Sequence, residues 1–152
     1  MSRARPRVVF LDAATYGDIS LRRFTEAWDC TVHQVTAPGE CQALVDGNYL
    51  QQALMNLLLN AIDASGQNGK VGLSLSPGNA NVEISVEDSG PGLTLEQQER
   101  MFEAFYTTKA GGTGLGLAVT KTLLEKMGAT IESVKGARGA RFRVLLPAGV
   151  EA

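Results

Sequence analysis

The sequence has few of the residues on which several classes of protein depend. Its two cysteines, Cys30 and Cys41, are too few for a disulfide framework and lack metal-ligand spacing, which indicates ordinary thiols in a reducing compartment. A net charge of −2 offers no basic surface to a nucleic-acid backbone. The longest apolar run near the start, Val8–Leu11, is too short for a signal peptide or a membrane span. We therefore expect a cytoplasmic chain without a nucleic-acid partner or direct membrane contact.

The chain is long enough for one well-formed core. It has 152 residues, of which 44% are hydrophobic, and this leaves no room for two large domains. Periodicity and turn residues predict strands at 7–12, 31–36, 43–46, 70–76, 82–88, 130–134 and 140–146, and helices at 20–28, 48–64, 95–102 and 114–127. Antiparallel strands interleaved with one-sided helices predict a two-layer α/β sandwich of the α+β class.

Capping residues support the helix predictions. The long helix over 48–64 has an apolar stripe and ends before Gly66. Thr94 and Gln97 have the spacing of a capping box at the start of the third helix. Gly128 has the position of a left-handed cap at the end of the last helix.

Two asparagines lie on one face of the long helix. Asn56 and Asn60 are one helical turn apart, and Asp63 extends the same face. An amide oxygen is a suitable ligand for Mg²⁺, which takes few protein oxygens together with substrate phosphates. A solvated helix face is the simpler interpretation of these residues. Asparagine is a mediocre residue inside a helix, however, so two among leucines indicate a specific role.

A carboxylate and two glycines follow an apolar strand. Asp88 ends the strand, where it can accept a hydrogen bond from an exocyclic amine, and Gly90 and Gly92 let the backbone approach a flat ring. The same residues also have the chemistry of an ordinary turn. The turn alone does not distinguish the two interpretations.

A second glycine cluster opens the last predicted helix. Gly112, Gly114 and Gly116 expose amide donors, and the helix presents its positive end to an anion. Lys109 can contact a terminal phosphate as a point charge. A flexible surface loop with a solvated lysine fits the same sequence. Together with the carboxylate turn, however, the cluster predicts a pocket for ATP.

The order of these motifs resembles the sensor histidine kinases. Asn56–Ala61 is similar to their N box, Asp88–Gly92 to their first glycine box, Phe102–Lys109 to their F box and Gly112–Leu117 to their second glycine box. The match covers residues 31–147. It implies the Bergerat-type sandwich shared with gyrase, Hsp90 and the mismatch-repair ATPases, with a mixed, mostly antiparallel sheet and helices on one face.

The resemblance implies roles for individual residues. Asn60 would hold Mg²⁺, Asn56 and Lys109 would face the phosphates, and these three would be the catalytic groups, whereas Asp88 would receive the adenine amine. Residues 102–116 would form a lid over the nucleotide. The residues implied in binding are Asn56, Asn60, Asp63, Asp88, Gly90, Gly92, Phe105, Thr108, Lys109, Gly112, Thr113, Gly114, Leu115 and Gly116.

The residue at position 56 favours one kind of chemistry. The hydrolysing ATPases of this fold usually carry a glutamate there as general base, whereas Asn56 cannot take a proton. This favours phosphoryl transfer to a partner group over hydrolysis, because positioning and charge stabilisation suffice when the nucleophile comes from elsewhere.

The resemblance does not supply an acceptor. The single histidine, His33, lies in a predicted strand without the flanking residues of an acceptor motif, which favours a structural role. We therefore expect a fragment, or a chain whose acceptor lies on another protein. Residues 1–30 are interpreted as an extension or linker and residues 31–148 as the catalytic domain.

These observations predict a protein-histidine kinase catalytic domain of two-component signalling. Its partners would be a histidine-containing dimerisation/phosphotransfer domain and a response regulator, and it could be the cytoplasmic part of a larger membrane-bound sensor. The alternatives are a serine kinase or anti-sigma regulator of the same fold, and a degenerate domain that binds nucleotide only to control assembly.

Overall fold

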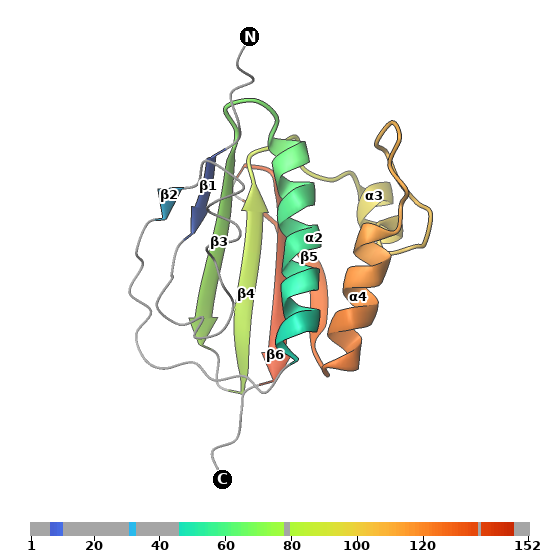
Figure 1. Cartoon of the computed structure of the whole chain (residues 1–152). Helices are drawn as coiled ribbons and strands as arrows, with labels where there is room; N and C mark the ends of the chain where they lie inside the picture. The colour runs from blue at the N-terminus through green and yellow to red at the C-terminus, as the bar shows by residue number, and fades with distance from the viewer. Residues whose placement is uncertain (1–6, 11–30, 33–45, 78–79, 137, 148–152) are drawn as a thin grey trace.

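One six-stranded sheet and two long helices make up most of the structure, a computed structural model that describes residues 7–10, 31–32, 46–77, 80–136 and 138–147. The strand order is β2-β1-β3-β4-β6-β5, and α2 and α4 cover one face of the sheet (Figure 1). The elements are β1 Arg7–Phe10, β2 Thr31–Val32, α2 Gly47–Ser65, β3 Lys70–Pro77, β4 Asn81–Asp88, α3 Leu95–Arg100, α4 Gly116–Lys126, β5 Thr130–Lys135 and β6 Ala140–Pro147.

The sheet is mixed, as predicted. Strand β1 pairs in parallel with β2 and β3, whereas β3, β4, β6 and β5 form an antiparallel series. The two-layer arrangement of the α+β class is therefore confirmed. Among the described residues, no helix combines the length and the apolar character needed to cross a bilayer.

Helix α2 begins at a side-chain cap. The Asp46 carboxylate accepts hydrogen bonds from the backbone N–H groups of Asn48 and Tyr49, at 2.9 and 3.1 Å. The strand predicted at 43–46 is therefore wrong at Asp46, and its other residues lie outside the described part. The helix itself agrees with the prediction over 48–64, because its apolar stripe packs on the sheet and Leu57 is fully buried.

Buried residues alternate along β4 and β6, and this alternation extends the hydrophobic core to the end of β4. In β4, Val82, Ile84 and Val86 are buried beneath the helices, and Asp88 continues this series at the end of the strand. In β6 the buried positions begin at Ala140. The period of two therefore directs the Asp88 carboxylate into the layer between sheet and helices.

The remaining helices differ from the predictions mainly at their ends. The capping box of α3 is present, because the Thr94 hydroxyl accepts from the Gln97 N–H at 3.2 Å and Gln97 Oε1 accepts from the Thr94 N–H at 2.8 Å. Helix α4 starts at Gly116 rather than near Gly114, since Gly114 has a left-handed φ of 69° that is incompatible with a helix. Gly128 has a φ of 70° and forms the predicted cap.

The N-terminal predictions are described only in part. The predicted strand at 7–12 is present as β1, and it joins the sheet through β3. Of the predicted strand at 31–36, the structure describes β2. The predicted helix at 20–28 and His33 lie outside the described residues. The proposed boundary between an extension and a catalytic domain at residues 30–31 stays a prediction.

Candidate functional site

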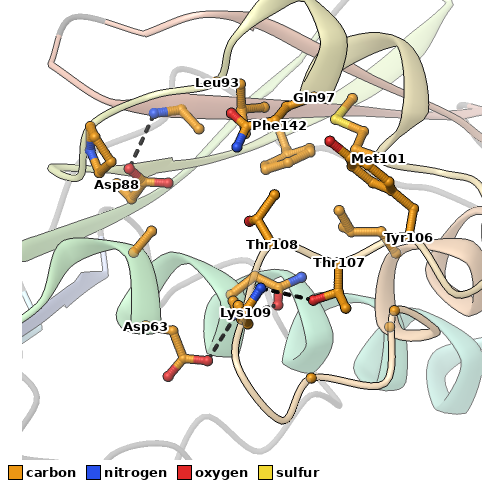
Figure 2. Close-up of a pocket in the computed structure, with 18 of the residues that line it drawn as sticks. Asp63, Asp88, Leu93, Gln97, Met101, Tyr106, Thr107, Thr108, Lys109 and Phe142 are labelled. Carbon is orange, nitrogen blue, oxygen red and sulfur yellow. Dashed lines mark hydrogen bonds and ion pairs between the residues drawn. The ribbon is translucent and has the colours of Figure 1, made fainter.

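A cavity of about 650 Å³ opens between the sheet, α2, α3 and the segment that leads into α4. Figure 2 shows polar groups of α2 and this segment at one end of the cavity and Asp88 at the other. The cavity is lined by ten of the predicted site residues: Asn60, Asp63, Asp88, Gly92, Thr108, Lys109, Gly112, Thr113, Gly114 and Gly116. Its size is within the range of small-molecule and cofactor sites.

Asp88 is the buried polar group of the cavity. Its side chain is 4% exposed, and Oδ1 accepts hydrogen bonds from the backbone N–H groups of Gly90 and Ala140, at 2.9 and 3.1 Å. Within the described part of the chain both donors use Oδ1, so Oδ2 is available to a ligand. A buried carboxylate oxygen facing a cavity is a strong acceptor for an amine.

Two glycines let the backbone close around Asp88. A Cβ atom at Gly90 would lie 2.5 Å from the Ala64 carbonyl oxygen, so the turn approaches the end of α2 more closely than a side chain allows. Gly92 has a φ of 79°, in the left-handed region that favours glycine. Gly92 lines the cavity, whereas Gly90 does not line it and donates its backbone N–H to Asp88 Oδ1.

Apolar side chains form the walls beside Asp88. Leu93, Met101 and Phe142 line the cavity, and Met101 and Phe142 also belong to the hydrophobic core. Such walls suit a flat aromatic ring whose one polar edge meets a fixed acceptor. This end of the cavity can therefore hold a purine whose amino group meets Asp88.

A cluster of charged and amide groups lies at the other end. The Lys109 ammonium donates to Asn60 Oδ1 at 3.1 Å and forms an ion pair with Asp63 Oδ2 at 2.9 Å (Figure 2). Both charged side chains are about half exposed, so the pair itself adds little stability. The geometry puts a positive charge, a carboxylate and an amide oxygen together at this end of the cavity, and a positive charge there can attract an anionic group.

The same cluster tests whether the residues suit Mg²⁺. In this structure the oxygens of Asn60 and Asp63 already hold a cation, the Lys109 ammonium. Magnesium takes one or two protein oxygens and completes its coordination with phosphates and water. Among the described residues, no three or more His, Cys, Asp or Glu side chains are grouped so that they could hold a metal ion. The donor set therefore fits a metal held mainly by a nucleotide.

A loop whose two ends are joined lines the cavity between α3 and α4. The Phe105 N–H donates to the Gly114 carbonyl at 2.9 Å, which joins the two ends of the segment. Phe105 has a φ of 69°, and a Cβ atom at Gly114 would lie 2.4 Å from the Phe105 carbonyl carbon. Only glycine therefore fits at position 114. We call residues 105–114 the lid.

Four predicted site residues do not line the cavity. Gly90 lies behind Asp88, Phe105 is 76% exposed, and Leu115 precedes α4 with a half-exposed side chain. The Asn56 amide donates to Gly116 O at 3.4 Å and Thr120 Oγ1 at 3.3 Å, which joins α2 to the first turn of α4. A direct role of these four residues in binding stays a prediction.

Ten lining residues were not among the predicted site residues: Ala64, Pro91, Leu93, Gln97, Met101, Tyr106, Thr107, Leu117, Ala140 and Phe142. Four of them, Pro91, Tyr106, Thr107 and Leu117, lie inside the motifs that carry the resemblance, and the other six lie outside these motifs. Buried and partly buried residues alternate along β6, which pairs with β4. This alternation puts Ala140 and Phe142 on the buried face, next to the strand that ends at Asp88.

Gly139 is a further position that shapes the site, and it is not among the residues predicted from the sequence. A Cβ atom there would lie 2.3 Å from Asp88 Oδ1 and 2.8 Å from the Gly90 nitrogen. Because residue 139 has no side chain, the Asp88 carboxylate can occupy the space that a Cβ atom at position 139 would fill. Its location just before the last strand is the available sequence signal.

The fold and this cavity define an ATP-binding domain, and the chain belongs to the family of histidine kinase-, DNA gyrase B- and HSP90-like ATPases, whose profile matches residues 45–150. The relatives of this chain within the family include sensor histidine kinases. The chain is 48% identical over 107 residues to the sensor histidine kinase ZraS of Escherichia coli O157:H7, covering 69% of this chain and 23% of that protein. The chain thus spans about a quarter of the length of this relative.

Solved structures give the same assignment. Full-length ShkA in complex with AMPPNP aligns with a TM-score of 0.71 and 28% identity, over 97% of this chain and 26% of that chain. Histidine kinase ThkA in complex with the response regulator protein TrrA aligns with a TM-score of 0.60 and 31% identity, over 68% and 30% of the two chains. The chain is similar to the ATP-binding part of these kinases.

Proposed function

We propose that this chain binds Mg-ATP in the cavity and transfers the γ-phosphoryl group to a histidine on a separate dimerisation/phosphotransfer domain. The observation that carries the proposal is one cavity with two chemically different ends. Buried Asp88 faces one end, and Lys109 with Asn60 and Asp63 forms the other. A nucleoside triphosphate has the matching polarity, with an amine at one end and phosphates at the other.

The residues around the phosphate end support transfer rather than hydrolysis. The Asn56 amide is a donor to Gly116 and Thr120, and an amide cannot act as a general base on water. Lys109 and the N-terminal end of α4, which begins at Gly116, supply positive charge to the transferring group. The nucleophile then has to come from a partner.

A transfer reaction in trans tests the proposal. The chain is incubated with Mg-ATP and the dimerisation/phosphotransfer domain of a relative such as ZraS, and the modified residue is identified by mass spectrometry. We expect phosphohistidine on that domain, and none when its acceptor histidine is replaced by alanine. The relative's own catalytic domain is the positive control. ATP binding without phosphohistidine would contradict the proposal, and phosphoserine on a partner would favour the serine-kinase alternative.

The magnesium role of Asn60 makes a separate prediction. Replacing its side-chain oxygen in Asn60→Ala should reduce the ATP affinity in Mg²⁺ to that in EDTA, because the amide oxygen is the proposed protein ligand. Calorimetric titration in both buffers measures this. Asn60→Asp keeps an oxygen and should keep the Mg²⁺ effect, and Asn48→Ala on the same helix is the matched control. An undiminished Mg²⁺ effect in Asn60→Ala would refute the metal role.

We also propose a partner that receives the phosphoryl group after its transfer to histidine. ThkA, to which the chain is similar, was solved with a response regulator, and we propose that a response regulator receives the phosphoryl group in this system too. ATP and response regulators are cytoplasmic, so we place this domain in the cytoplasm, as part of a larger kinase.

A further inference from the structure

Arg100, the last residue of α3, makes three contacts in three directions. Its Nη1 atom lies 3.3 Å from Glu96 Oε1, and its Nε atom lies 3.2 Å from Glu103 Oε2. Its Cζ atom lies 4.4 Å from the centroid of the Tyr106 ring. The hydrogen bond to Glu103, aided by Glu96, raises the pKa of Arg100 above its ordinary value. Two carboxylates therefore fix the guanidinium against the ring.

Tyr106 connects this contact to the cavity. It follows Phe105 at the start of the lid, its N–H donates to the Glu103 carbonyl at 3.3 Å, and its side chain lines the cavity. Figure 2 shows the Tyr106 ring on the same side of the cavity as Met101. The ring is thus a wall of the site with Arg100 packed on it.

We infer that Arg100 is a positioning residue for the nucleotide, because it holds the Tyr106 ring in place at the start of the lid. The inference rests on the proposed function, since it assumes that ATP occupies this cavity. A cation over an aromatic ring is attracted by the negative ring face, and arginine also stacks through its plane. Without it the ring gains rotamer freedom, which the nucleotide must then restrict.

The contacts distinguish this role from ordinary helix stabilisation. An i,i+4 ion pair with Glu96 would be enough to support α3. The contacts to Glu103 and Tyr106 instead reach beyond the helix to residues on either side of Phe105, the first residue of the lid. A lysine could keep the charge near both carboxylates, but it lacks the planar group that stacks on the ring.

The experiment compares Arg100→Met and Arg100→Lys by calorimetric titration with Mg-ATP, with thermal unfolding measured without nucleotide. Arg100→Met should bind ATP about threefold more weakly, the effect that an exposed cation–π contact supports, and Arg100→Lys should lose less affinity, because it keeps a cation without the planar group. Tyr106→Phe keeps the ring and should keep the affinity. In a Tyr106→Leu background, Arg100→Met should have no further effect on affinity, because the ring through which it acts is gone.

Lys121 provides the matched control. Its ammonium lies 5.4 Å from the Phe102 ring centroid and pairs with Glu125 one turn along α4, but neither Lys121 nor Phe102 lines the cavity. Lys121→Met should therefore leave ATP affinity unchanged.

Three results would overturn the role of Arg100. The first is unchanged ATP affinity in both Arg100 variants. The second is a loss of ATP affinity from Arg100→Met in the Tyr106→Leu background that equals its loss in the unsubstituted chain. The third is a loss of ATP affinity in Lys121→Met that equals the loss in Arg100→Met. Failure of the unsubstituted chain to bind ATP would overturn the proposed function as well, so the two failures can be told apart.

Discussion

Asp88→Ala is expected to weaken ATP binding by about 1–3 kcal/mol, a factor of about 5 to 150, because a buried amine of the nucleotide loses its acceptor. The carboxylate is buried, and its Oδ1 atom also holds the backbone N–H groups of Gly90 and Ala140. The alanine variant should therefore lose thermal stability too. Calorimetric titration with ATP and thermal unfolding measure the two effects.

Asp88→Asn separates the two effects. An asparagine keeps the oxygen that accepts from Gly90 and Ala140, so it should be more stable than the alanine variant. Its amide would meet the adenine amine as donor against donor, and ATP affinity should fall. Inosine triphosphate has a carbonyl in place of that amine. The ratio of its affinity to that of ATP should therefore be higher for Asp88→Asn than for the unsubstituted chain. Unchanged ATP affinity in both variants would refute the adenine role.

Gly139→Ala is expected to destabilise the domain by about 1–3 kcal/mol, the usual cost of forcing extra atoms into a packed region. The added Cβ would lie 2.3 Å from Asp88 Oδ1 and 2.5 Å from the Asp88 carbonyl oxygen. Relief requires Asp88 to move, so ATP affinity should fall together with stability. Urea unfolding and calorimetric titration measure the two changes.

Gly72→Ala is the matched control for this substitution. Gly72 lies in β3, has no positive φ, and a Cβ atom there would meet nothing within 4 Å. Its replacement should change stability little and leave ATP affinity intact. Equal stability and affinity in the Gly139 and Gly72 variants would contradict the proposed close approach.

The sequence predicted those elements whose signals are local. Helix α2 has an apolar period that continues over five turns, and α3 has a capping box, so both were found with nearly correct bounds. The error at Asp46 has a local cause, because a helix cap has an extended backbone, with φ −71° and ψ 112° here, that resembles a strand. The start of α4 was predicted two residues early, since Gly114 belongs to the lid closure.

The site was predictable where several motifs pointed to the same ligand. Asn60, Asp88 and Lys109 each fit an ordinary solvated or turn position when taken alone, but the order of their motifs predicted one nucleotide site, and the structure brings the three residues to one cavity. Met101 and Phe142 were missed because a buried apolar residue is explained by the core alone, and only the fold shows that the core reaches the cavity. The Lys109 contact to Asn60 spans 49 positions, which no local pattern encodes.

The hydrogen bond between Phe105 and Gly114 also has a consequence for variation in lid length. Because the ends of the lid are joined to each other, residues inserted between them extend a loop whose ends stay fixed, without displacing α3 or α4. Doubling the length of a flexible loop costs only about 0.6 kcal/mol in closure entropy. Lids of different length can therefore be exchanged at these two residues while the rest of the domain keeps its structure.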